Sequence, residues 1–373
     1  MLDFTFSTTG RIVFSAGATG QLGELCAQLG IKHMGLVTDR TVLELGLTEQ
    51  AQAAIKDHGI SITIYDGTAP DPTEDMLDDA VNLLSDCDGI VSIGGGSSLD
   101  IAKLVAVRLR STQALSDMYG VGNVTGARLP LILVPTTAGT GSEVTPISIL
   151  TTSNNEKMGV VSELLLPDIA VLDPDLTLGL PRGVTAATGV DAMVHAIEAF
   201  TSKHRKNPMS DALAREALRL LGSNIRRVCE EPGDREARGA MLLGSCFAGQ
   251  AFANAPVAAV HALAYPLGGQ FHVPHGLSNC LVLPEVLAFN APQAAEMYDE
   301  LAQIVFGNGV ALADGFRALA PDIGLVTTLR DVGVAEGDLE GLAADAMKQT
   351  RLLVNNPREV TYEDALAIYR AVF

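Results

Sequence analysis

Short apolar runs alternate with helical stretches over the first 180 residues, and this alternation restricts the possible folds more than any other feature of the sequence. Predicted strands cover residues 11–14, 33–38, 61–65 and 89–93, followed by 131–134 and 169–172. A predicted helix lies between each pair of consecutive strands among the first four. The first helix covers about 19–29, the second ends at about 58, and the third covers about 74–85. A chain that alternates strand and helix in this way folds into a parallel, doubly wound sheet.

After residue 180 the pattern becomes helical throughout. Ala, Leu and Glu recur at helical spacing in segments 184–201, 211–229, 235–254 and 293–305. The boundary falls between 175 and 183, where Pro and Gly interrupt the periodicity. Because 373 residues exceed one ordinary domain, we expect an α/β domain over 1–180 and an all-helical domain over 181–373.

The charge and the cysteines restrict partners and location. A formal net charge of −19 repels phosphate backbones and anionic lipids, so we expect no nucleic-acid or membrane partner. The apolar stretches fall well short of the roughly 20 residues that span a bilayer. The five cysteines are odd in number and form no Cys-x-x-Cys pair. A reducing compartment is therefore favoured, and we expect a cytoplasmic protein.

A glycine-rich turn follows the apolar segment 90–93. Gly94, Gly95 and Gly96 precede Ser97 and a helical stretch. Glycines let the backbone approach a bulky anion, and the free N–H groups of the helix that follows suit a pyrophosphate. The pattern is neither Gly-x-Gly-x-x-Gly nor a P-loop. The alternative is a tight strand-to-helix turn in which Ser97 is the N-cap.

A second segment, 135–143, offers hydroxyl groups and flexible backbone after a predicted strand. Thr136, Thr137 and Thr140 supply the hydroxyls, which suit phosphate and ribose. Lys157 lies a little further on and is able to supply a cation to the same group. The alternative for Lys157 is an ordinary solvated surface lysine.

Asp39 closes the predicted strand 33–38. A carboxylate at this position accepts hydrogen bonds from an adenosine ribose and repels a 2′-phosphate, which favours NAD over NADP. The alternative is a helix-capping aspartate in front of Arg40.

The helical half carries carboxylate and imidazole groups at ligand-like spacing. Asp191 and His195 are four residues apart, on one face of a helix. His261, His272 and His275 follow downstream in apolar sequence, where an unpartnered titratable group is costly. One carboxylate with two or three imidazoles suits Fe²⁺ or Zn²⁺. The alternative for each residue, His195 above all, is a hydrogen-bonded core histidine.

Four segments, in this order and spacing, resemble the signature segments of the iron-dependent (group III) alcohol dehydrogenases. They are 94–103, 135–143, 189–198 and 261–276, and the agreement runs from about residue 10 to residue 290. The resemblance implies a dehydroquinate-synthase-like fold. In it the α/β domain binds the dinucleotide, the helical domain holds the metal, and the protein is a homodimer or larger homo-oligomer.

Residue by residue, the resemblance implies the following sites. The metal ligands are Asp191, His195, His261 and His275; the pyrophosphate loop is Gly95, Gly96 and Ser97; further cofactor contacts are Thr136, Thr137, Thr140 and Lys157, with Asp39 setting the preference for NAD. Asp71 corresponds to a cofactor-side position that is often Asn. Four ligands favour Fe²⁺ as the metal, with Zn²⁺ as the alternative.

The chain departs from the family pattern at Tyr265, where many relatives have a histidine assigned to proton relay or substrate contact. That role then passes to Tyr265, to His272, or to the cofactor ribose and solvent. Phe252 is a pocket wall by family position, and the alternative is a core phenylalanine.

The function implied is hydride transfer between NAD and a small alcohol or aldehyde, with the metal as Lewis acid. Three alternatives stay open. The Tyr265–Pro266 pair also resembles the hydroxyacid–oxoacid transhydrogenases. A metal-dependent sugar-phosphate cyclase or lyase shares the fold but needs a cluster of basic residues. A non-catalytic dinucleotide-binding protein would keep the fold without turnover.

Overall fold

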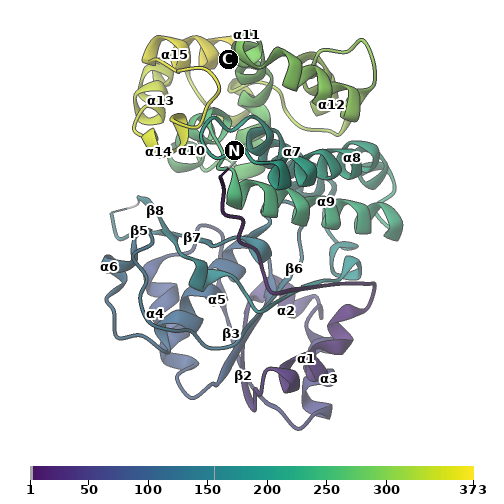
Figure 1. Cartoon of the computed structure of the whole chain (residues 1–373), viewed down its shortest axis with the longest axis vertical. Coiled ribbons are helices and arrows are strands. Elements are labelled where there is room, and N and C mark those ends of the chain that lie inside the picture. The colour runs from purple at the N-terminus through teal and green to yellow at the C-terminus, as the bar shows by residue number, and fades with distance from the viewer. Residues whose placement is uncertain (1–2, 155) are drawn as a thin grey trace. The chain divides into compact units, whose positions relative to one another are not determined.

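A computed structural model describes residues 3–154 and 156–373, and this part of the chain forms two compact units (Figure 1). The α/β unit comprises Ser7–Thr137 and Gly141–Thr177. The helical unit comprises Leu178–Phe373, together with Ala138–Thr140 and the described residues before Ser7.

The α/β unit is built on a six-stranded sheet with the order β1-β9-β6-β4-β2-β3, in which every pairing is parallel. The strands are β1 (Arg11–Phe14), β2 (His33–Asp39), β3 (Ser61–Thr68), β4 (Gly89–Gly94), β6 (Leu131–Pro135) and β9 (Ile169–Leu172). Strands β4, β6 and β9 are buried along their whole length, as apolar strands covered on both faces should be. The parallel α/β fold expected for this half of the chain is confirmed.

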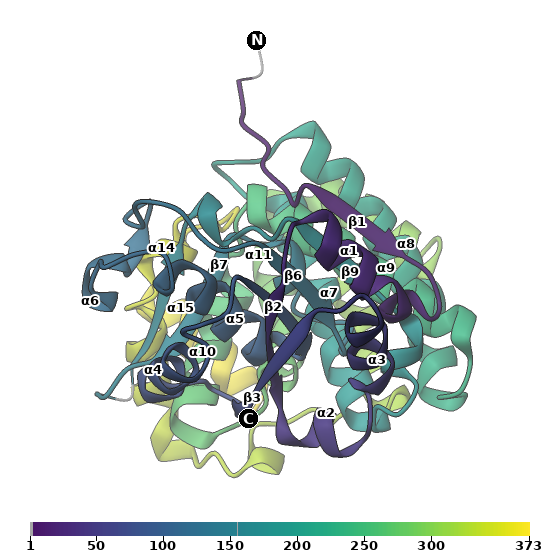
Figure 2. The ribbon, with the colours of Figure 1, turned by 90° about the horizontal axis from the view of Figure 1, so that it is seen from below.

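Helices cover both faces of the sheet. α1 (Leu22–Gln28) and α3 (Glu49–Asp57) lie on one side, while α4 (Glu74–Leu83) and α5 (Gly96–Arg108) lie on the other (Figures 1 and 2). Two separate apolar cores result, because alternate strand residues point to opposite faces. The short elements η1 (Ala18–Gln21) and α2 (Arg40–Glu44) follow β1 and β2.

The register of the central strands brings two of the predicted cofactor segments together. Ile93 pairs with Val134 and Gly94 with Pro135, so β4 and β6 end side by side. The neighbouring strand β2 ends at Asp39. In open parallel sheets, ligands bind outside the carboxyl ends of the strands, which is where these three strands stop.

A three-stranded sheet with the order β5-β8-β7 was missed by the sequence analysis. It comprises β5 (Gly120–Val121), β7 (Ile147–Thr151) and β8 (Lys157–Val161). The strands are two to five residues long, and Ser, Gly and Lys interrupt their apolar positions, so no periodic run marks them. Shorter elements of this unit are α6 (Leu115–Met118), η2 (Ser142–Val144), η3 (Glu163–Leu165) and η4 (Pro174–Thr177).

The helical unit is arranged around α7 (Arg182–Thr201), which is buried on all sides along most of its length. The other helices are α8 (Pro208–Glu230), α9 (Arg235–Asn254), α10 (Ala259–Phe271), α11 (His275–Phe306), α12 (Leu312–Asp322), α13 (Leu339–Ala346), α14 (Thr350–Leu353) and α15 (Tyr362–Ala371), with the 3-10 turns η5 (Arg330–Val332) and η6 (Glu336–Asp338). A buried central helix is expected to be apolar. The polar residues that α7 does contain therefore need partners.

Helix α11 is longer than the sequence analysis predicted. The expected segment 293–305 covers only its second half. Pro284 and Pro292 lie inside the helix, and Ala294 has non-helical backbone angles (φ −123°, ψ 17°) that mark a kink. Among the described residues, no helix is both long and apolar enough to cross a membrane.

Candidate metal centre and cofactor loop

Four side chains of the helical unit converge on one point. Asp191 and His195 come from α7, His261 from α10, and His275 is the first residue of α11. Their ligand atoms all lie within 4.8 Å of one another, and His275 alone is partly exposed. One carboxylate oxygen and three imidazole nitrogens at this separation fit a divalent transition metal such as Fe²⁺ or Zn²⁺.

Gly276 lets the start of α11 approach α7. A Cβ atom at this position would lie 2.3 Å from the backbone oxygen of Ala187, which no larger residue tolerates. This close approach places His275 Nε2 3.5 Å from Asp191 Oδ1. Gly276 therefore allows α11 to pack closely against α7, and His275 before it contributes a nitrogen to the donor set.

Hydrogen bonds to acceptor oxygens orient the imidazoles of His195 and His261. His195 Nδ1 lies 3.2 Å from the backbone oxygen of Gly139, and His261 Nδ1 lies 2.6 Å from Glu198 Oε2. Both partners are acceptors, so each ring donates from Nδ1 and keeps Nε2 as an acceptor. A ring that binds a metal through Nε2 needs this tautomer.

Asn279, on α11, lies among the same groups. Its Nδ2 atom donates to Asp191 Oδ1 at 2.6 Å, and lies 3.3 Å from His261 Nε2 and 3.4 Å from His275 Nε2. Its Oδ1 atom is buried and makes no hydrogen bond. The amide thus contacts three of the four candidate ligands.

At His195 and Asp191 the electrostatics favour the protonation states that a metal site requires. Burial lowers the pKa of His195 to about 3, so this imidazole is neutral near pH 7. Burial alone would raise the pKa of Asp191, but the three imidazoles, His275 first, and Asn279 outweigh it and lower that pKa. For His261, burial is outweighed by Glu198 and Asp191, which raise its pKa. A metal that binds His261 through Nε2 would displace the proton from that nitrogen.

Two aromatic rings flank the cluster. The ring of Phe252 stacks on that of His195, with 4.2 Å between the ring centroids and an angle of 19° between the ring planes. The ring of Tyr265 lies edge-on to that of His261, with 6.5 Å between their centroids. Its centroid lies 5.9 Å from that of the His275 ring. Both are therefore placed beside the donor set. His272 caps the end of α10 in a left-handed conformation (φ 54°), is exposed, and is not one of the four clustered residues.

In the α/β unit, Gly95 is the N-cap of α5, and Gly96 and Ser97 begin its first turn. The alternative in which Ser97 caps the helix is wrong, because Ser97 lies inside it and the N-cap makes no side-chain hydrogen bond. The first-turn N–H groups of this 13-residue helix suit an anion.

The other predicted cofactor residues occupy different surroundings. Thr136 follows β6 directly, and its backbone N–H donates to Gly94 O at 2.9 Å. Thr137 is the next residue in the α/β unit. Thr140 belongs to the segment Ala138–Thr140, which is part of the helical unit. Asp39 Oδ1 accepts from Val42 N at 2.9 Å, so it does cap α2, as the alternative held. That bond uses one carboxylate oxygen.

Lys157 is on β8 and pairs with Asp71, the Nζ–Oδ1 distance being 2.6 Å. Asp71 has a left-handed backbone (φ 54°), uncommon for a non-glycine residue. Two residues that the sequence analysis treated separately thus form one ion pair.

Three buried polar residues were missed by the sequence analysis, although all of them support the predicted sites. Glu198 and Asn279 contact the candidate ligands, and Asn279 follows His275 by four residues, a spacing that places both on one helix face. Lys103 is fully buried and donates to Ser142 Oγ at 2.8 Å and to Ile147 O at 2.7 Å. It thereby fixes the loop that follows Thr137.

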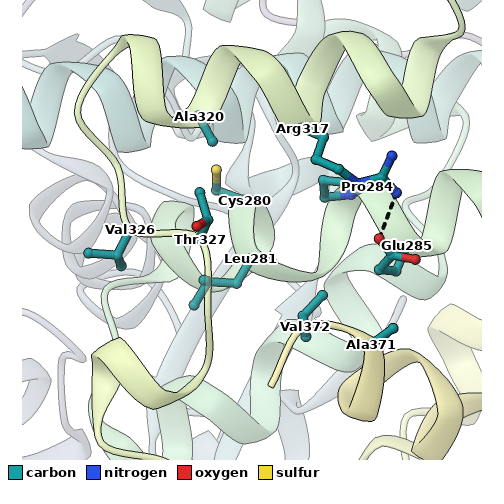
Figure 3. Close-up of a pocket in the computed structure, with 10 residues that line it drawn as sticks. All are labelled: Cys280, Leu281, Pro284, Glu285, Arg317, Ala320, Val326, Thr327, Ala371 and Val372. Atoms are coloured by element: carbon teal, nitrogen blue, oxygen red, sulfur yellow. Dashed lines mark hydrogen bonds and ion pairs between the residues drawn. The ribbon is translucent and has the colours of Figure 1, made fainter.

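A cavity of about 230 Å³ lies on another face of α11 (Figure 3). Its charged groups, Arg317 and Glu285, pair with each other at 2.6 Å. Burial raises the pKa of the Cys280 thiol to about 12, so this thiol stays protonated near pH 7. None of the four clustered residues lines it.

Both halves of the chain match known families. Residues 9–174 match the family described as iron-containing alcohol dehydrogenase. Residues 185–373 match the Fe-containing alcohol dehydrogenase family, C-terminal. Long-chain-alcohol dehydrogenase 1 of Geobacillus thermodenitrificans is 39% identical, over 98% of this chain and 97% of the relative.

Solved structures agree with the observed fold. The crystal structure of a 1,3-propanediol oxidoreductase has a TM-score of 0.96 and 34% identity, over 100% of both chains. The sulfoacetaldehyde reductase of Bifidobacterium kashiwanohense, in complex with NAD⁺, has a TM-score of 0.91 and 30% identity, over 100% of this chain and 99% of the other.

A parallel α/β unit with a glycine-rich turn and a helical unit with a buried Asp–His₃ donor set define a metal-dependent oxidoreductase. The chain belongs to the iron-containing alcohol dehydrogenase family, as its resemblance predicts, and it is an enzyme of the iron-type alcohol dehydrogenase class.

Proposed function

We propose that this enzyme transfers hydride between NAD and a small alcohol or aldehyde at a site held by Asp191, His195, His261 and His275. The observation that carries the proposal is the convergence of their four ligand atoms within 4.8 Å. A protein that only bound a dinucleotide would have no need of such a donor set, and the family match argues against a cyclase or lyase.

The α/β unit would hold the dinucleotide. Gly95, Gly96 and Ser97 would bind the pyrophosphate at the start of α5, and Asp39 would accept from the adenosine ribose. Thr136, Thr137, Thr140 and Lys157 would supply the remaining polar contacts. A relative of the same fold is known in complex with NAD⁺, which supports NAD as the cofactor.

The helical unit would hold a divalent ion, which we propose to be Fe²⁺, with Zn²⁺ as the alternative. Four protein donors and the family's description favour iron. When bound, the ion would act as a Lewis acid on the substrate oxygen.

The aromatic residues would shape the space beside the donor set. Phe252 covers one face of His195 and would exclude water from it. The ring of Tyr265 contacts those of His261 and His275 and carries a phenolic hydroxyl, so we propose it as the first member of the proton relay, which accepts the alcohol proton as it passes its own proton to solvent. His272 is the less favoured candidate, because it lies outside the cluster.

The test is NAD⁺ and NADP⁺ reduction by short primary alcohols, diols and hydroxy acids. The protein is stripped of metal and then reloaded anaerobically with Fe²⁺ or Zn²⁺. We expect the activity to require metal and to be higher with NAD⁺ than with NADP⁺. We also expect uncharged alcohols to be oxidised faster than hydroxy acids. Turnover of hydroxy acids alone, with an oxoacid as acceptor, would favour the transhydrogenase alternative instead.

We also propose that the enzyme is a cytoplasmic homodimer. All five cysteines are free and buried, which suits a reducing compartment. Light scattering after gel filtration tests the assembly, and we expect roughly twice the chain mass of 39.0 kDa.

A further inference from the structure

Glu198 contacts the donor set without belonging to it. It lies on α7, three residues after His195, and its side chain is 5% exposed. Its Oε2 atom lies 2.6 Å from His261 Nδ1, and its Oε1 atom accepts from the backbone N–H of Val260 at 2.7 Å. Each carboxylate oxygen thus has its own donor.

Both donors belong to the first turn of α10, which begins at Ala259. The N-cap residue, Ala258, has no side chain able to accept a hydrogen bond from the free N–H groups of that turn. Glu198 supplies this acceptor from another helix. The carboxylate therefore fixes both the start of α10 and the ring of His261, which α10 carries.

We propose that Glu198 is a positioning residue of the metal centre, and that it keeps the His261 proton on Nδ1 so that Nε2 faces the ligand set. The proposal rests on the proposed function. A carboxylate behind a ligating imidazole fixes its tautomer and makes it a stronger ligand. Glu198 also adds a second buried negative charge to that of Asp191, so a divalent cation would be neutralised by two carboxylates, only one of them a ligand.

The two donors explain why glutamine cannot replace Glu198. A carboxamide has one acceptor oxygen, whereas two N–H groups require an acceptor. If the oxygen faces Val260, the amide nitrogen faces His261 and the ring must move its proton to Nε2. If the oxygen faces His261, two N–H groups oppose each other at Val260. Either arrangement disturbs the site while side-chain volume is kept.

The test is metal binding by metal-free protein, titrated with Zn²⁺ in a calorimeter and with Co²⁺ by visible absorption. We expect Glu198→Gln to bind Zn²⁺ 10- to 100-fold more weakly than wild type and to show an altered Co²⁺ spectrum. Glu285→Gln is the matched control, because it removes a carboxylate of α11 that pairs with Arg317 and lies outside the donor set. It should bind both metals as wild type does.

A Zn²⁺ affinity of Glu198→Gln within twofold of wild type, with an unchanged Co²⁺ spectrum, overturns the role of Glu198 and leaves the proposed function standing. Wild-type protein that binds neither metal overturns the proposed function as well. If Glu198→Gln does not fold, ¹⁵N NMR of histidine-labelled, metal-free wild type, at a pH where His261 carries a single proton, decides the question. A proton on Nδ1 of His261 supports the proposal, and a proton on Nε2 overturns it.

Discussion

Asn279 donates a hydrogen bond to Asp191 across 2.6 Å, and the two side chains are buried together. Asp191 is the only carboxylate among the four candidate ligands. Its orientation therefore depends on a residue that carries no charge and lies on a different helix. Because burial disfavours a free carboxylate, this hydrogen bond also contributes to keeping Asp191 ionised.

We predict that Asn279→Leu destabilises the metal-free protein. Leucine is close in size but cannot donate, so Asp191 would lose its hydrogen bond inside the protein. The expected loss is about 1–3 kcal/mol of the free energy of unfolding, measured by urea denaturation with chelator present.

Asn224→Leu is the control for that measurement. The Asn224 amide bonds to the backbone oxygen of Leu220 one turn earlier in the same helix. Its replacement should change stability by no more than about 0.5 kcal/mol. Equal effects of the two substitutions would show that the Asn279–Asp191 hydrogen bond contributes no more to the free energy of unfolding than the Asn224–Leu220 hydrogen bond does.

His261→Ala should remove bound metal and activity together. His261 is central to the cluster, in ring contact with His195 at 4.7 Å and with His275 at 5.3 Å between centroids. Metal content by mass spectrometry of the purified protein should fall below about one tenth of the wild-type content, since one of four donors is lost. His204→Ala, at an exposed position, should retain full metal content. A metal-free His261→Ala protein with full activity contradicts the metal mechanism.

The α/β half of the fold could be predicted from the sequence because its central strands are mainly apolar. Ile90–Ile93 and Leu131–Val134 are buried on both faces, and their runs of Val, Ile and Leu are interrupted only by Ser92. The sheet that contains Lys157 could not be predicted, because its strands are half exposed and short. Their pairing is set by contacts distant in sequence.

The donor set was predictable for a related reason. Asp191 and His195 stand out because charged or titratable groups are rare in an apolar helix. Glu198 and Asn279 lack this signal, since Glu and Asn are ordinary on helix surfaces. Only the packing of α7, α10 and α11 shows that these two side chains are buried against the ligands.

Asp39→Asn should relax the preference against NADP. Asparagine keeps an oxygen that can accept from Val42 N, so the cap of α2 is retained while the negative charge is lost. We expect the ratio of kcat/KM for NAD⁺ to that for NADP⁺ to fall by about tenfold, which corresponds to about 1.4 kcal/mol.

Asp39→Ala separates the two roles of this residue. It removes the cap as well and should cost about 1 kcal/mol of stability that Asp39→Asn does not. A wild-type enzyme that already prefers NADP⁺ would show that Asp39 does not select the cofactor.

Stability should fall with rising pH because of Glu143, in η2. Its side chain is buried, and its Oε1 atom has no hydrogen-bond partner. Burial raises its pKa from 4.5 to about 7, although its own backbone N–H and the charge of Lys103 act in the opposite direction. Below pH 4.5 the carboxyl group is protonated in both the folded and the unfolded chain. Between 4.5 and 7 the unfolded chain loses the proton first, so the folded state becomes progressively less favoured.

Glu143→Gln removes this titration. Relative to wild type, the variant should gain free energy of unfolding as the pH rises from 4.5 to 7, by up to about 3 kcal/mol, and the gain should stay constant above pH 7. Urea denaturation at pH 4.5, 6 and 8 measures it, with Glu44→Gln, at an exposed position of α2, as the control. If the difference between Glu143→Gln and wild type does not change with pH, the Glu143 carboxyl group is not held protonated by burial, and a counter-charge or water must reach it.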